Sequence, residues 1–219
     1  MRIQNLLYYI LLVFLSGCTQ YHQAESMSDR LPLVYPDYTD VTFPMNIAPP
    51  NFRIQEEGEA FQTEIGCGEE SCYMLIQDDE PVVRIPEKKW KALLEKAAGK
   101  KIYFRITVKQ HGRWMRYADI QNSISAHEID SFLAYRLLYP GYELWNEMGI
   151  YQRDLTTYEQ TPIVENRDFG KQCINCHTFN RNSPDTMMVH VRGKQGGTLI
   201  SLNGEIEKVN PKPEEYTHG

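Results

Sequence analysis

The sequence lacks the features of several large protein classes. Its 23 Lys and Arg are outnumbered by 29 Asp and Glu, so the net charge is −6 and nucleic acid is not expected as a partner. No apolar run reaches the length of about 20 residues that spans a bilayer as a helix. No pattern of acid–base or nucleophilic side chains marks a hydrolase. The composition, 42% hydrophobic and 24% charged, is that of an ordinary globular protein.

Cysteine is also scarce, and the spacing of the five cysteines limits what they can do. A single C-x-x-C is present, and neither a second one nor an H-x3–5-H pair accompanies it, so a zinc site would lack its other half. No βαβ pattern surrounds the motif, which disfavours a redox pair of the thioredoxin type. A plain structural disulfide stays open as an alternative for this pair.

Residues 173–177 spell C-x-x-C-H, the pattern of covalent c-type haem attachment. Two thiols three positions apart can each add to one vinyl group of a haem, and the histidine that follows can ligate the iron. Random placement of the cysteines and histidines would give roughly 0.003 such pentapeptides in a chain of this composition. We therefore predict one covalent haem c, with Cys173 and Cys176 as the thioether residues and His177 as the proximal ligand.

The N-terminus predicts export and lipidation. Arg2 precedes an apolar core, residues 6–15, that is too short for a transmembrane helix. The core ends in Leu15-Ser16-Gly17-Cys18, which looks like a bacterial lipobox; an ordinary secretory signal is the alternative. We expect lipidation of Cys18, which would anchor the chain to a bacterial membrane, facing the periplasm or the cell surface. Covalent haem attachment takes place on the outer side of the bacterial inner membrane, which is where this N-terminus would send the chain.

The other two cysteines, Cys67 and Cys72, flank the turn-like sequence Gly68-Glu69-Glu70-Ser71. Export places them in an oxidising compartment, where disulfides persist. We predict a disulfide across a hairpin, with a modest effect on stability because the loop that it closes is short. Two free thiols are the alternative.

The 14 Tyr and 12 Pro, with few long periodic apolar runs, favour a mainly β fold. We expect an antiparallel β-sandwich-like domain with one short helix, followed by a haem-motif loop and small β-hairpins. The helix is predicted over residues 86–98, because an apolar stripe recurs there at helical spacing. The stripe consists of Trp90, Leu93, Leu94 and Ala97.

Strict alternation of apolar and polar residues over 101–109 predicts the clearest strand, which forms a hairpin with residues 114–117. Asn203-Gly204 predicts a two-residue hairpin turn between strands at 198–202 and 205–209. The segment 125–139 is ambiguous, since Ser125 and Glu128 would suit the start of a helix as a capping box. Further short strands are expected at 41–43, 51–55, 60–65, 72–77, 82–85, 148–155 and 187–192.

These patterns divide the chain into five parts. They are a lipoprotein signal peptide at 1–17, a flexible tether at 18–40, a β-rich domain at 41–160, a haem-binding segment at 161–210 and a polar tail at 211–219.

Several stretches resemble a group of bacterial envelope lipoproteins described as TolB-like or cytochrome c-related. The stretches are Asn46–Pro49, Tyr135–Trp145, Met148–Leu155, the C-x-x-C-H and Met188–Gly193 with Gly196–Thr198. The resemblance covers most of residues 41–209 and implies a β-rich domain, a haem-motif segment and a C-terminal β-propeller. Only 219 − 177 = 42 residues follow His177, too few for a propeller, so we expect a truncated or short variant.

A single haem needs a sixth iron ligand or an open position. If residues 187–192 are extended, Met188 and His190 share one side of the strand and are the distal candidates. The favoured hypothesis is a membrane-anchored electron carrier with an unidentified redox or protein partner in the envelope. The alternatives are an envelope binding protein whose C-x-x-C-H is structural, as a disulfide or a structural haem, and a haem enzyme with an open distal position.

Overall fold

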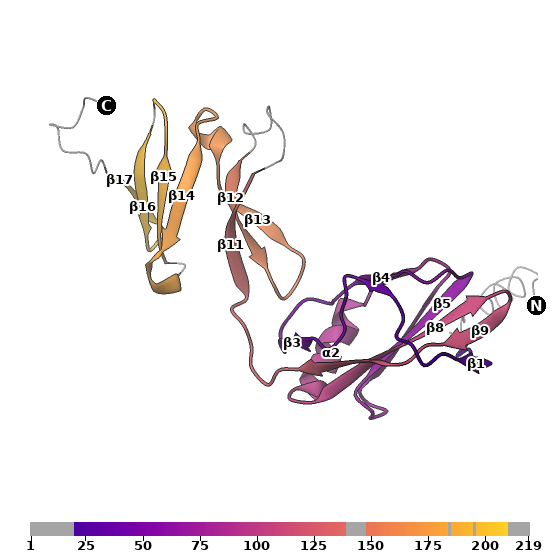
Figure 1. Ribbon diagram of the computed structural model, residues 1–219. Coiled ribbons are helices and arrows are strands. Elements are labelled where there is room, and N and C mark those ends of the chain that lie inside the picture. Colours follow the sequence, from indigo (N-terminus) through magenta and orange to yellow (C-terminus); the bar gives the residue numbers. More distant parts are fainter. Residues whose placement is uncertain (1–19, 139–147, 184, 195, 210–219) are drawn as a thin grey trace, which may run out of the picture. The chain divides into compact units, whose positions relative to one another are not determined.

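The computed structural model describes residues 20–138, 148–183, 185–194 and 196–209. The predicted signal peptide, Cys18 and the polar tail at 211–219 lie outside the described residues. The chain divides into two compact units, Met1–Ile129 and Asp130–Gly219 (Figure 1). The predicted boundary after residue 160 is therefore misplaced, because strands on both sides of it pair with each other in unit 2. The described residues are mainly β, as predicted, with one α-helix.

Unit 1 holds ten strands and the helix within its described residues. They are β1 Ser26–Met27, β2 Val34–Tyr35, β3 Thr42–Phe43, β4 Phe52–Ile54, β5 Ala60–Gly66, β6 Tyr73–Asp78, β7 Val82–Val83, α2 Glu87–Ala97, β8 Lys101–Gln110, β9 Arg113–Arg116 and β10 Ile120–Ile124.

The long strand β8 organises unit 1. It pairs antiparallel with β5 along one edge and with β9 and β10 along the other. The predicted alternation is confirmed on its inner side, where Ile102, Phe104, Ile106 and Val108 are almost fully buried. A smaller sheet, β2-β4-β7, and helix α2 complete the core. The helix buries its predicted stripe, and the Trp90 indole N–H donates a hydrogen bond to the carbonyl of Ile47.

The segment predicted as a flexible tether is instead part of unit 1 from residue 20 onward. Strand β1 pairs in parallel with β9, and β2 pairs with β4. Val34 is buried, and the Arg30 guanidinium forms a bidentate ion pair with the buried carboxylate of Glu56. The prediction of a tether was wrong because it took the polar side chains of this segment to be solvated, whereas they bond to the rest of unit 1.

The predicted disulfide between Cys67 and Cys72 is present, with the two Cα atoms 5.6 Å apart. It closes the loop between β5 and β6. Two lysines hold the same loop: Lys96 donates to the carbonyl of Ser71, and Lys100 pairs with Glu69 at 2.8 Å. The loop therefore has support besides its covalent bond.

We expect the double variant Cys67→Ala/Cys72→Ala to lose about 2 kcal/mol of unfolding free energy, the chain-entropy value for so short a loop. Urea unfolding of the full chain measures this loss. Ser71→Ala is the matched control, because this exposed residue supplies only its carbonyl to the loop. A loss in the control as large as in the double variant would contradict the assignment.

Unit 2 holds two small antiparallel sheets, β11-β12-β13 and β14-β15-β16-β17. The strands are β11 Phe132–Leu137, β12 Gly149–Asp154, β13 Gln160–Glu165, β14 Ile174–Phe179, β15 Thr186–Val191, β16 Gly197–Leu202 and β17 Glu205–Val209, with 3-10 turns at Asn166–Phe169 and Asn180–Asn182.

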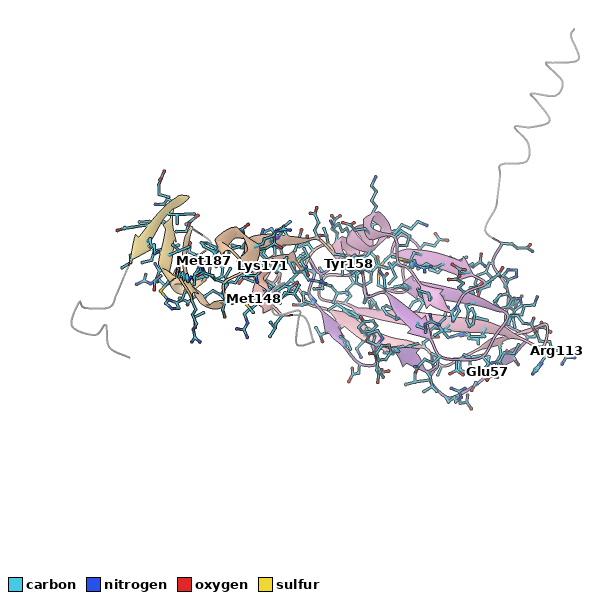
Figure 2. The ribbon with its side chains drawn as sticks, turned by 90° about the horizontal axis from the view of Figure 1, so that it is seen from above. Glu57, Arg113, Met148, Tyr158, Lys171 and Met187 are labelled. Atoms are coloured by element: carbon cyan, nitrogen blue, oxygen red, sulfur yellow. A yellow bond between two sulfur atoms is a disulfide. The ribbon has the colours of Figure 1, made fainter. Side chains whose placement is uncertain are left out.

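The two sheets of unit 2 share one apolar cluster. Ile150 of β12 packs with Ile174 of β14 and with buried side chains of β15, among them Met187. Figure 2 labels Met187 among the side chains of unit 2. The predicted Asn-Gly turn joins β16 to β17, and both of its residues have positive φ, which suits a two-residue hairpin. Among the described residues, no helix has the length and apolarity to cross a bilayer.

The described part of the ambiguous segment, residues 125–138, contains a strand at Phe132–Leu137 and no helix. The Ser125 hydroxyl accepts the amide of His127, two residues on, which closes a turn instead of capping a helix. Residues 132–137 then pair with β12 over their whole length.

Candidate functional site

The C-x-x-C-H motif lies at the start of β14, where the sequence analysis expected a loop. This strand is the edge of its four-stranded sheet, and it pairs only with β15 within that sheet. Ile174 lies opposite Val191 and His177 opposite Val189. The two residues of β14 between Ile174 and His177 therefore lie opposite a single residue of β15, His190. This is a β-bulge, which changes the side toward which a strand's later residues point.

The bulge places both motif cysteines on one side of the sheet. Cys176 directly precedes His177, which pairs with Val189, and neighbouring residues of a strand point to opposite sides, so Cys176 points to the side of His190. The carbonyl of Cys173 accepts the Arg192 amide at 2.8 Å, which extends the ladder by one residue. Because residues 190 and 192 are on the same side of β15, Cys173 and Cys176 are too. Both thiols are free; Cys173 is half-buried and Cys176 is exposed.

His177 points to the opposite side. It shares a face with Val189 and with Phe179, whose ring lies edge-on to the imidazole with centroids 6.3 Å apart. This is the side that carries the apolar cluster of unit 2, on which Phe179 packs. The imidazole is half-buried there. The predicted proximal ligand and the predicted thioether residues are therefore separated by the thickness of the sheet.

The two predicted distal ligands lie on the side of the cysteines. Met188 and His190 share a face of β15, as predicted, while Met187 lies on the other. His190 Nδ1 is 3.1 Å from the hydroxyl oxygen of Thr198 on β16, and Met188 has 37% of its surface exposed. Neither is on the side of His177, so this arrangement does not bring the proximal and distal candidates together.

One further feature of unit 2 was not found from the sequence. A hollow of about 380 Å³ lies at the far end of β14 and β15, lined by Phe179, Met187, Met188 and Ile200 among others. The lining of this hollow includes neither motif cysteine nor His177. Arg192 is exposed on the side of the cysteines, where a guanidinium can pair with carboxylates. Within the described ranges, no three His, Cys, Asp or Glu side chains are grouped to hold a metal ion.

The site thus fits one half of a c-type haem attachment. Two free thiols on one side of an edge strand are accessible for thioether formation. The predicted iron ligand does not fit. While β14 is paired with β15, His177 faces the apolar cluster of unit 2, on the side away from the two thiols. The fold and the site define a mainly β protein with an accessible dithiol on an edge strand. No protein-family model matches the chain, and no curated protein matches it in sequence. The resemblance to TolB-like lipoproteins stays a prediction.

Proposed function

We propose that the chain is a lipid-anchored envelope protein that carries one haem c on Cys173 and Cys176 and serves in one-electron transfer. The observation that supports this proposal is the position of the two thiols. They are free, they share one side of an edge strand, and the bulge that aligns them lies within the motif itself. Without the bulge, residues three apart on a strand would point to opposite sides.

The roles of the chain's own residues follow from this placement. Cys173 and Cys176 would hold the haem, and Arg192 beside Cys173 would pair with a carboxylate of the bound group. The iron of a haem cycles between ferric and ferrous forms and so supplies the electron-transfer chemistry. His177 could ligate only if the motif leaves its pairing with β15. The electron partner would be another envelope protein, and Cys18 would supply the membrane anchor.

The test is expression of the full chain in a bacterium with a c-type maturation system, followed by acid–acetone extraction and a pyridine haemochrome spectrum. We expect haem to stay with the polypeptide. The variant Cys173→Ala/Cys176→Ala is expected to lose all covalent haem. Cys67→Ala/Cys72→Ala is the matched control, because it also removes two cysteines, and it should retain the haem. Wild-type protein without covalent haem would refute the proposal.

A second candidate function is supported by the side to which His177 points. If this residue never leaves the apolar cluster, the motif cysteines are a disulfide or dithiol pair on the surface of an envelope binding protein. Intact mass of the exported protein separates the two cases. A chain lighter by two hydrogens at this pair, with no haem adduct, favours the binding protein; a chain heavier by one haem favours the carrier.

A further inference from the structure

The segment that follows Cys18 is fixed to unit 1 almost from its first residue. The amide side chain of Gln77 donates to the carbonyl of Gln20 at 2.7 Å. Gln62, which is fully buried, accepts the amide of His22 at 2.9 Å and donates to its carbonyl at 3.1 Å. The Tyr21 hydroxyl donates to the buried carboxylate of Glu64. Side chains of the neighbouring strands β5 and β6 therefore bond to three consecutive residues of the segment, 20–22.

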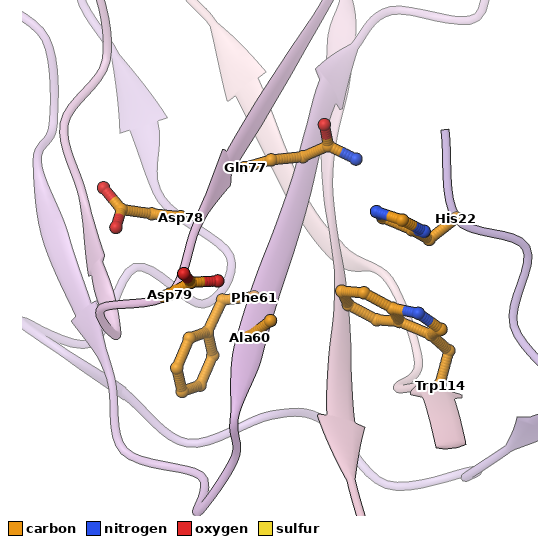
Figure 3. A pocket seen from close by; sticks show the side chains of 7 residues that line it. All are labelled: His22, Ala60, Phe61, Gln77, Asp78, Asp79 and Trp114. Atoms are coloured by element: carbon orange, nitrogen blue, oxygen red, sulfur yellow. The ribbon is translucent and has the colours of Figure 1, made fainter. Parts of the chain in front are cut away.

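Strand β9 contacts the same segment at several residues from His22 to Ser28. The imidazole of His22 stacks on the indole of Trp114, with ring centroids 4.5 Å apart and an interplanar angle of 12° (Figure 3). The Glu25 amide donates to the carbonyl of Trp114, and the Ser28 amide to that of Arg116, each at 2.8 Å. Residues 20–28 are therefore bonded to the sheet at several points and do not form a free linker.

This attachment limits how far unit 1 can lie from its anchor. Two peptide units separate Cys18 from Gln20, and an extended chain spans at most about 3.6 Å per residue, so the two Cα atoms are within about 7 Å. An acyl chain on Cys18 would hold Gln20 at the level of the phospholipid headgroups.

Two large apolar side chains, Tyr21 and Met27, are exposed on the face of the main sheet that carries the stack of His22 on Trp114. Leu33 and Tyr35 are exposed on the opposite side of unit 1, where β2 pairs with β4. Tyrosine and tryptophan are enriched where proteins meet the membrane–water interface. An open hollow of about 420 Å³ adjoins the stack of His22 on Trp114, and Asp78 and Asp79 line it (Figure 3). These carboxylates repel anionic lipids and attract the ammonium groups of zwitterionic headgroups.

We propose that unit 1 lies directly against the membrane that holds Cys18, with residues 20–27 and the stack of His22 on Trp114 in contact with zwitterionic phospholipid headgroups. This inference rests on the proposed lipidation of Cys18. Unit 1 would then be held at the bilayer surface and not on the flexible tether that the sequence predicts. Its partners in the envelope would be proteins that reach the membrane surface.

The test measures whether Trp114 touches lipid. Acylated full-length protein is placed in vesicles of phosphatidylethanolamine and phosphatidylcholine that contain a headgroup-labelled nitroxide lipid. The protein carries Trp145→Phe, and a Trp114→Phe version supplies the background from the buried Trp90. The matched variant has about ten Gly/Ser residues inserted between Thr19 and Gln20, which adds roughly 17 Å of reach. We expect nitroxide quenching of Trp114 at least about threefold stronger without the spacer than with it.

A second arm keeps this test independent of natural lipidation. A chain that begins at Cys18, with Cys173→Ser and Cys176→Ser, is coupled through Cys18 to a maleimide phospholipid and bound to the same vesicles. Absence of Trp114 quenching in this vesicle-bound chain overturns the inference. Quenching here, with no acyl group found on the exported protein, instead refutes the lipidation of Cys18 and leaves the contact between Trp114 and lipid intact. Equal quenching with and without the spacer also overturns the inference.

Discussion

Replacing Glu56 by Gln should lower the free energy of unfolding by about 2 kcal/mol at pH 7, because it removes a buried charge with charge-assisted hydrogen bonds. The carboxylate accepts two hydrogen bonds from Arg30 at 2.7 and 2.6 Å, one from the Leu33 amide at 2.7 Å and one from the Tyr117 hydroxyl at 3.1 Å. From the loop after β4, it joins residues 30–33 to Tyr117, the residue directly after β9. Its loss should loosen the N-terminal segment as well as the core.

The same group predicts how stability depends on pH. The hydrogen bonds from Arg30 lower the pKa of Glu56 from its ordinary value of 4.5; burial opposes this shift, and the Leu33 amide and Tyr117 hydroxyl reinforce it. A carboxylate whose pKa is depressed in the folded state stabilises the fold above its unfolded pKa. That contribution is lost as the pH falls from about 4.5 through the lower folded value. The wild-type protein should lose stability over this range, and Glu56→Gln should lose less.

Urea unfolding followed by the fluorescence of Trp90 and Trp114, the two tryptophans of unit 1, in a Trp145→Phe background, measures both effects. Glu57→Gln is the matched control, because Glu57 is the exposed neighbour and only its backbone carbonyl is bonded. The control should stay within about 0.5 kcal/mol of the wild type. Equal losses at positions 56 and 57, or the same acid sensitivity in Glu56→Gln and wild type, would contradict the role given to the buried carboxylate.

The sequence predicts most elements of this fold, since periodicity is a local property. The stripe of α2 and the alternation of β8 are visible in consecutive residues, and both are buried as expected. The tether was predicted wrongly for the opposite reason. Residues 20–22 are held by Gln62, Gln77 and Glu64, which are more than 35 positions away in the sequence. A single amide side chain gives no sign in the sequence of whether it will bond to water or to a distant backbone.

The candidate site shows the same limit on a smaller scale. Strand alternation correctly placed Met188 and His190 on one side of β15, with Met187 on the other. It could not place His177 relative to them, because that depends on the register between two strands and on the one-residue bulge within the motif. A shift of one residue moves every later side chain to the other face. The motif residues were read correctly as a chemical pattern, while their directions required the pairing.

Haem attachment with His177 as an iron ligand should therefore release the motif from β15. The release is inexpensive, because β14 is an edge strand and only one row of hydrogen bonds is lost, each worth about 1 kcal/mol. It also exposes Ile174, which is fully buried, at roughly 1.5–3 kcal/mol. The bond between the iron and the His177 imidazole would have to outweigh these costs, because the thioether bonds can form on the paired strand as well. Hydrogen-exchange mass spectrometry should show a peptide spanning 171–179 that loses protection in the haem-bearing protein, while residues 197–209 in β16 and β17 stay protected.

The variants His177→Ala and His190→Ala decide what the exchange result means. If the motif opens and only the His177 variant changes the haem spectrum, His177 is the ligand and the paired strand is incompatible with ligation. If the peptide stays protected and the His190 variant changes the spectrum, the iron is ligated from the side of the cysteines and His177 remains in the apolar cluster. Protection retained together with ligation by His177 would contradict the register, because no ligand can reach an iron through the sheet that separates it from the thiols.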